Sequence, residues 1–271
     1  MKIRAFTLIE LLVVIAIISV LGGVTFTAVA SARRSGNQTR EVSAGRQLMT
    51  AYVRAATDRD GDLLPAYAAD GSATNEAGQT ITGPSAQRYP WRLARYLDGR
   101  VFGTLLVNDQ ARLGQNSKRE DLDYLVSFAP TFGINGTYVG GNFRGSLAPG
   151  GLAEKKFGRF CVTRMTDPVA PARLIVFVSA HYTGVDGKPY LGYHTVNAPC
   201  ETRRIWSAGR YKDGAPAETL GYIHPRYDGR AVAVMFDGHA ELLTPAELDD
   251  MRRWSNQAAE LDRQDFLIGQ N

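Results

Sequence analysis

The 271-residue sequence contains few of the residues that usually build a metal or redox site. It has only two cysteines, Cys161 and Cys200, which stand far apart and in no CxxC pair. If the chain is exported, these cysteines predict a single disulfide. The HExxH, GxSxG, GxGxxG and P-loop patterns are all absent, which argues against the common hydrolases, nucleotide-binding proteins and metalloenzymes. We therefore expect a protein without a cofactor.

An excess of charge of one sign is also absent. Lysine and arginine total 31 against 27 aspartates and glutamates, and the net charge of +4 is spread along the chain. A nucleic-acid partner would need a basic stripe or patch, so none is expected. With 44% hydrophobic residues the chain can bury a core, which suits one domain of about 200 residues plus an accessory segment.

The accessory segment is an apolar run at residues 6–30, in which the only charged residue is Glu10. At about 1.5 Å per helical residue the run is long enough to cross a bilayer, so it predicts a transmembrane helix. Lys2 and Arg4 precede it and favour a cytoplasmic amino terminus, with the rest of the chain outside. Two arginines just after the run oppose this orientation.

The helix is expected to continue through residues 31–57. There, five apolar residues recur at spacings of three, four and seven, which places them on one helix face. Gly22 and Gly23 are poor helix formers and predict a bend or a locally melted turn in the apolar half. The sequence thus predicts one helix over 6–57, apolar all round at first and amphipathic later. The five residues are Val42, Met49, Tyr52, Val53 and Ala56.

Residues 5–15, AFTLIELLVVI, resemble the class III signal of type IV pilins and type II secretion pseudopilins. In that family a membrane prepilin peptidase removes a short basic leader and methylates the new amino terminus. The resemblance implies a leader at 1–5, cleavage between Ala5 and Phe6, and N-methylation of Phe6. Ala5 stands where glycine is usual in the family. Glu10 becomes the fifth mature residue, where the family keeps a glutamate.

The resemblance also gives Glu10 a function. A charge in hydrocarbon is costly, so an intramembrane carboxylate usually has a partner or a function. In pilin-like filaments this glutamate pairs with the positive amino terminus of the adjacent subunit, which implies that Glu10 acts in filament assembly. The alternative is a carboxylate that extends to the nearby cytoplasmic interface. The implied partners are homologous subunits, the prepilin peptidase and an inner-membrane assembly platform.

Residues 58–271 are expected to form an α+β head built on an antiparallel sheet. The β-branched and aromatic run at 173–180 predicts a buried strand. Residues 231–244 predict a hairpin with a two-residue type I′ connection at Asp237 and Gly238. Thr244 and Glu247 predict a capping box that opens a final helix.

Shorter segments of the head carry weaker signals. Three alternating aspartates from Asp58 to Asp62 resemble half of a calcium loop, but the glutamate that would complete it is missing. A turn is the favoured interpretation, and a bound calcium ion is left open. Residues 66–85 predict a surface loop and residues 89–97 a short packed helix. Asn135-Gly136-Thr137 predicts a turn and is also a glycosylation sequon, whose use is left open.

The hairpin region carries a second resemblance. Residues 226–243, RYDGRAVAVMFDGHAELL, resemble the carboxy-terminal signature of a pilin-like family named for a histidine followed after nine residues by Asp-Gly. Asp237 and Gly238 match the Asp-Gly pair. Tyr227 stands ten positions before Asp237, where the family has its histidine, and His224 lies three residues earlier.

An enzymatic alternative rests on His224, Asp237 and His239, which could serve as metal ligands or as an acid and base pair. Their spacing fits no known metal motif, so we expect no enzyme and no metal site. We expect instead a structural subunit of a type IV pilus or type II secretion-like filament, with its head outside a single-pass inner-membrane helix. The alternative is an extracytoplasmic binding or metal-dependent catalytic domain on a pilin-type anchor.

Overall fold

The computed structural model describes residues 8–184 and 189–270, and begins with one helix, α1 (Leu8–Thr57), of 50 residues. The chain divides into two compact units at residues 39 and 40, a boundary that falls inside α1. The first unit holds the apolar half of the helix. The last part of α1, residues 40–57, belongs with the head.

A tight turn ends α1 at the aspartate-rich segment. The Gly61 amide donates to the Ala56 carbonyl at 2.9 Å, and Asp60 and Gly61 have φ values of 54° and 88°, as in helix caps that use left-handed residues. Arg164 holds the turn from outside, since it donates to the Asp60 carbonyl at 3.0 Å and pairs with Asp62 at 3.4 Å. The expected turn is therefore present.

The head is an α+β unit built on an antiparallel sheet, as the sequence predicts, and this sheet has four strands in the order β3-β4-β7-β8. Its strands are β3 (Phe132–Ile134), β4 (Ile175–Ser179), β7 (Ala231–Met235) and β8 (Ala240–Leu243). The short ladders beside it are β1 (Ala73–Thr74) with β2 (Thr80–Ile81), and β5 (His181–Thr183) with β6 (Pro189–Leu191). The helices of the head are α2 (Pro84–Gln87), α3 (Tyr89–Ala94), η1 (Arg95–Leu97), α4 (Asp109–Gln115), α5 (Arg119–Phe128), α6 (Leu152–Phe157), η2 (Ala208–Arg210), η3 (Ala217–Leu220), α7 (Pro245–Leu248), η4 (Met251–Arg253) and α8 (Asn256–Glu260).

The two central strands of the sheet, β4 and β7, are buried on both faces, which explains why every residue in them except Ser179 is apolar. Alternate residues of β7 belong to two separate core clusters: Val232 and Val234 pack with α1, whereas Ala233 packs with the carboxy-terminal elements. A β-bulge between Ile175 and Phe177 interrupts this alternation in β4. The buried strand predicted at 173–180 is confirmed.

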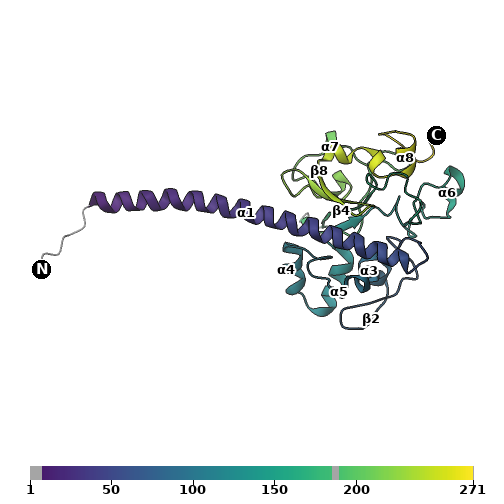
Figure 1. Ribbon diagram of the computed structural model, residues 1–271, viewed down its shortest axis with the longest axis horizontal. Coiled ribbons are helices and arrows are strands. Elements are labelled where there is room, and N and C mark those ends of the chain that lie inside the picture. The colour runs from purple at the N-terminus through teal and green to yellow at the C-terminus, as the bar shows by residue number, and fades with distance from the viewer. Residues whose placement is uncertain (1–7, 185–188, 271) are drawn as a thin grey trace. The chain divides into compact units, whose positions relative to one another are not determined.

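The last part of α1 lies against the sheet, with α3, α4 and α5 on its other side (Figure 1). The Tyr52 and Phe177 rings meet edge to face, with their centroids 5.5 Å apart. The predicted amphipathic face is confirmed, since Met49, Tyr52 and Ala56 are buried and Val42 and Val53 partly so.

The hairpin of β7 and β8 differs from the prediction in its connection. The Met235 amide donates to the His239 carbonyl at 2.9 Å, and the Gly238 amide donates back to the Met235 carbonyl at 3.0 Å. The loop therefore has three residues, with Gly238 at φ 93°, and a two-residue type I′ turn was the wrong prediction. A three-residue loop with a left-handed last residue is the next most common hairpin connection.

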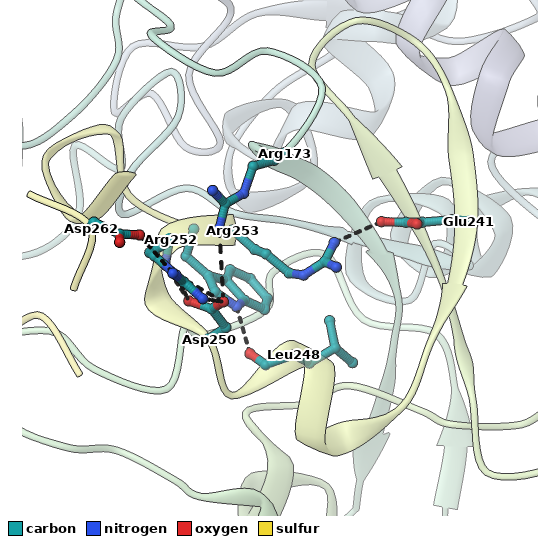
Figure 2. A network of polar contacts seen from close by, with 8 residues as sticks. Arg173, Glu241, Leu248, Asp250, Arg252, Arg253 and Asp262 are labelled. Atoms are coloured by element: carbon teal, nitrogen blue, oxygen red, sulfur yellow. Dashed lines mark hydrogen bonds and ion pairs between the residues drawn. The ribbon is translucent and has the colours of Figure 1, made fainter. Parts of the chain in front are cut away.

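The carboxy-terminal elements cover the second face of the sheet. The predicted capping box is present, because the Thr244 hydroxyl accepts from the Glu247 amide and the Glu247 carboxylate accepts from the Thr244 amide. Arginine and carboxylate pairs hold the segment that follows (Figure 2). Arg252 forms ion pairs with Asp250, at 2.8 Å, and with Asp262. Arg253 forms an ion pair with Glu241 of β8 at 2.7 Å.

Other local predictions have mixed outcomes. Residues 89–97 form α3 and η1 with Trp91 fully buried, as expected for a packed helix. The predicted loop at 66–85 contains the β1–β2 ladder instead of irregular chain alone. Asn135 is fully buried, and its amide donates to the Ile175 and Trp254 carbonyls at 2.9 and 3.1 Å. The sequon is thus part of the core and is closed to glycosylation in the folded head.

Candidate functional site: an exposed apolar helix and a buried carboxylate

The apolar half of α1 exposes its large side chains. Leu8, Ile9 and Phe26 are 78%, 74% and 82% exposed, and other leucines, isoleucines and valines of this half are about half exposed or more. An 18-residue window has a mean hydropathy of 2.6 and none of it is buried, so the helix is long and apolar enough to cross a membrane. Such a surface needs lipid or other protein around it.

Hydroxyl groups in this half are bonded to the helix itself. The Ser19 and Thr25 hydroxyls donate to the Ile15 and Leu21 carbonyls at 2.7 and 2.6 Å, one turn back. Hydroxyls satisfied in this way are compatible with an apolar surrounding. Glu10, which is exposed on the surface of this unit, is the only ionisable side chain of the segment from residue 8 to residue 32.

Gly22 and Gly23 lie within an uninterrupted stretch of α1. The expected break at this pair is therefore not observed. A Cβ atom at either position would meet nothing within 4 Å, so no packing inside the chain requires glycine there.

The head contains a second carboxylate of α1, which sequence reasoning missed. Glu41 is 1% exposed and accepts hydrogen bonds from the Ser179 hydroxyl and, at 2.6 Å, from the Tyr227 hydroxyl. Arg226 approaches the same carboxylate at 3.6 Å. The position of Glu41 on the apolar face, three residues before the buried Ala44, was the available signal.

Tyr227 occupies the position that the second resemblance assigns to a histidine. Burial and the neighbouring Glu41 raise the pKa of Tyr227, so its hydroxyl stays protonated and donates. The Tyr227 hydroxyl also accepts from the Asn108 amide at 3.3 Å. Tyr227 therefore ties the segment before the hairpin to α1, a structural role that needs no histidine.

The histidines considered as metal ligands lie in different settings. The His224 ring lies against His181, with centroids 4.5 Å apart, whereas His239 pairs with Asp237 at 2.6 Å. Burial and then the Arg226 charge lower the pKa of His181 to about 4 and that of His224 to about 2. Within residues 8–184 and 189–270, no group of three or more His, Cys, Asp or Glu side chains could hold a metal ion, and this includes the aspartates at 58–62.

The expected disulfide is not present. Cys161 and Cys200 are free, buried thiols that belong to the core cluster behind the sheet. Burial raises the pKa of both thiols, which keeps them protonated and unreactive. In this setting they act as small apolar side chains.

The expected processing residues, Ala5 and Phe6, lie outside the described residues. In comparison with known proteins, residues 1–26 match the model of the prokaryotic N-terminal methylation motif. No curated protein and no solved structure matches the chain. The matched segment ends inside the exposed apolar half of α1, so the motif and the candidate membrane helix coincide.

Proposed function

Because the chain opens with the methylation motif of type IV pilin-like prepilins, we propose that it is a structural filament subunit of a type IV pilus or a type II secretion-like pseudopilus. The observation that supports this most is the coincidence of the motif with an exposed apolar helix that carries one carboxylate. Before assembly the helix is held in the inner membrane, and the head lies on the outer side.

The proposed mechanism begins with removal of residues 1–5 by a prepilin peptidase. Hydrolysis of the peptide bond between Ala5 and Phe6 releases the leader with Lys2 and Arg4 and frees the positively charged amine of Phe6. In a second step the peptidase transfers a methyl group from a methyl donor to this amine. An assembly platform in the membrane then extracts the subunit, and Glu10 pairs with the amine of the neighbouring subunit. In the apolar interior of a filament, where water does not screen the charges, this pairing strongly favours one register.

The rest of the apolar half supplies the filament core. The apolar stretch from Leu8 to Val24 exchanges lipid contacts for contacts with neighbouring helices. Gly22 and Gly23 lower the local helix propensity by about 1 kcal/mol each relative to alanine, which eases bending or local melting during extraction.

Replacement of Glu10 tests this mechanism. Glu10→Val should leave membrane insertion and processing intact and should abolish filament formation, because the amine of the neighbour loses its counter-charge. Filaments are counted by electron microscopy of sheared cells, and processing is followed by the mass of the mature chain. Ser19→Ala is the matched control, since it removes a polar group from the same segment whose hydrogen bond is internal to the helix.

Efficient filament formation by Glu10→Val, or an equal loss of filaments in Ser19→Ala, would overturn the proposal. A Glu10→Val chain that is absent from the membrane would also contradict it, because the proposed role of Glu10 lies in assembly alone.

A further inference from the structure

An aromatic cluster lies at the surface of the head, at the edge of the two cores. It gathers side chains from α5, β5, β6, the segment after β6 and the turn after η3. Tyr124 and Tyr190 are 51% and 48% exposed, and the other rings are partly buried. We call these residues the aromatic patch: Tyr124, Phe128, Tyr182, Tyr190, Tyr193 and Tyr222.

The rings of the aromatic patch contact one another closely. Phe128 stacks on Tyr124 with centroids 5.4 Å apart, and meets the Tyr182 and Tyr193 rings edge to face at 5.3 and 5.4 Å. Tyr193 in turn contacts Tyr222 at 4.6 Å. Rings held in this way lose little conformational freedom when a ligand binds.

Backbone geometry is strained where Tyr222 joins the patch. Tyr222 has φ 67°, a left-handed conformation that is an outlier for a bulky residue. Its carbonyl accepts from the His181 amide at 2.9 Å and its amide donates to Ala217 at 2.8 Å, which holds the residue in place. Such strain often accompanies a functional constraint on where a side chain lies.

One arginine packs against rings of the aromatic patch, and a second lies next to the first, over the Tyr67 ring. The Arg88 guanidinium, 7% exposed, lies over the Tyr124 and Phe128 rings at 5.5 and 5.3 Å, and its Nε makes no hydrogen bond. Arg144 is exposed and lies over the Tyr67 ring at 5.5 Å. Tyr67 forms an isolated β-bridge with Arg88, which places Arg144 close to Arg88. Among the described residues neither arginine pairs with a carboxylate.

We propose that the aromatic patch, with Arg88 and Arg144, binds an anionic polysaccharide. Tyrosine presents an apolar ring face with a hydroxyl at its edge, which matches a sugar ring with its apolar C–H face and its hydroxyl rim. The exposed Arg144 supplies positive charge for a carboxylated or sulfated sugar, and the buried Arg88 adds to the potential from its position against the Tyr124 and Phe128 rings. The rings would contact the sugar faces, and the arginines would favour saccharides that carry negative charge.

Other occupants fit the patch less well. A nucleic-acid strand needs a series of cations along its backbone, and among the described residues the proposed site uses two arginines. A second protein chain of ordinary affinity buries about 800 Å² per partner around a dry apolar centre, whereas only two rings of this patch are more than a third exposed.

Binding to defined polymers tests the proposal on the full chain in detergent micelles, where no filament is needed. The probes are alginate, a linear polyuronate, and dextran, a neutral polysaccharide of similar length. We expect alginate to bind at least about tenfold more tightly than dextran, with an affinity that falls as salt rises. Tyr124→Ala and Tyr190→Ala should each weaken alginate binding about fivefold or more, because each removes an exposed ring face.

The variant Arg144→Gln tests the contribution of positive charge to binding. The control is Arg46→Gln, which changes an exposed arginine on α1. The first should weaken alginate binding and flatten its salt dependence, and the second should leave both unchanged. All four altered side chains are exposed, and circular dichroism checks that each variant is folded.

Equal binding of alginate and dextran, no binding of alginate, or variants that bind like the parent chain would overturn the proposal. Tighter binding to a single-stranded oligonucleotide than to alginate would overturn it in favour of a nucleic-acid site. These outcomes are independent of filament assembly, so they leave the proposed function of the helix untouched.

Discussion

Glu41 is a carboxylate that the head encloses almost completely, with 1% of the residue exposed. An ion removed from water is stable only when partners satisfy it, and here Ser179, Tyr227 and Arg226 do so. Two of these partners precede or open the carboxy-terminal hairpin. The polar cluster therefore connects α1 to the segment before the carboxy-terminal hairpin. Its loss should lower the stability of the whole head.

We predict that Glu41→Leu lowers the free energy of unfolding by about 3 kcal/mol, because it leaves Arg226 and two hydroxyls without their acceptor. Tyr227→Phe should cost about 1–2 kcal/mol, since the carboxylate keeps its other partners. Denaturant unfolding followed by circular dichroism measures both. Glu260→Leu, at an exposed site, is the control and should change stability by no more than about 0.5 kcal/mol. A Glu41→Leu chain as stable as its parent would show that the cluster contributes nothing.

The two histidines in ring contact, His181 and His224, predict a dependence of stability on pH. An unfolded histidine binds its proton near pH 6.5, whereas burial lowers the pKa of His181 to about 4 and that of His224 to about 2 in the fold. Between pH 6.5 and 4 the unfolded chain thus binds more protons, and stability must fall as pH falls. Each histidine changes the free energy of unfolding by at most about 1.4 kcal/mol per pH unit.

The measurement is unfolding free energy at a series of pH values from 7 to 4.5. The double variant His181→Phe, His224→Phe keeps the ring contact and removes both titrations, so its curve should be flatter than that of the parent. Parallel curves would mean that carboxylates alone set the acid sensitivity.

At the scale of elements, Gly45 sets how closely α1 approaches the sheet. A Cβ atom there would lie 2.6 Å from Val234 and 3.2 Å from Phe132. We predict that Gly45→Val destabilises the head by about 1–3 kcal/mol or more, because overpacking outweighs any gain in helix propensity. Thermal unfolding measures the effect. Gly36→Ala, where a Cβ atom meets nothing within 4 Å, is the control and should not destabilise the protein.

Elements whose signal is local could be predicted from the sequence. The periodicity of residues 31–57, the apolar run at 173–180 and the Thr244 capping box each depend on neighbours within a few positions, and each has its expected structure. The loop of the final hairpin was predicted with the wrong length. Asp-Gly suits both two-residue and three-residue connections, and the strand register decides between them.

Features that depend on distant partners could not be predicted. Glu41 meets Ser179 and Tyr227, which lie 138 and 186 residues further along the chain. The sequence around Asn135 predicts a turn at the surface. Asn135 is buried instead, because its side-chain amide donates to the carbonyl of the distant Trp254. The aromatic patch likewise has no common sequence signal, because its rings come from separate elements.

At the scale of the whole molecule, the methylation motif predicts a specific mature chain. We expect the protein recovered from its own membrane to begin at Phe6 with one added methyl group on the amine. Mass spectrometry of the amino-terminal peptide measures this, and Glu10→Val should give the same terminus as the parent. A chain that retains residues 1–5, or one that is cut after Ala30, would contradict pilin-type processing.

The position of β7 in the sheet determines when the core of the head can form during translation. This strand begins at residue 231, yet it lies between β4 and β8 and packs against α1, which is synthesised much earlier. Until β7 emerges, the apolar faces of β4 and of the last part of α1 lack their cover. Contacts between parts so distant in sequence form late and slowly. We therefore expect the core of the head to form only after β7 has been synthesised.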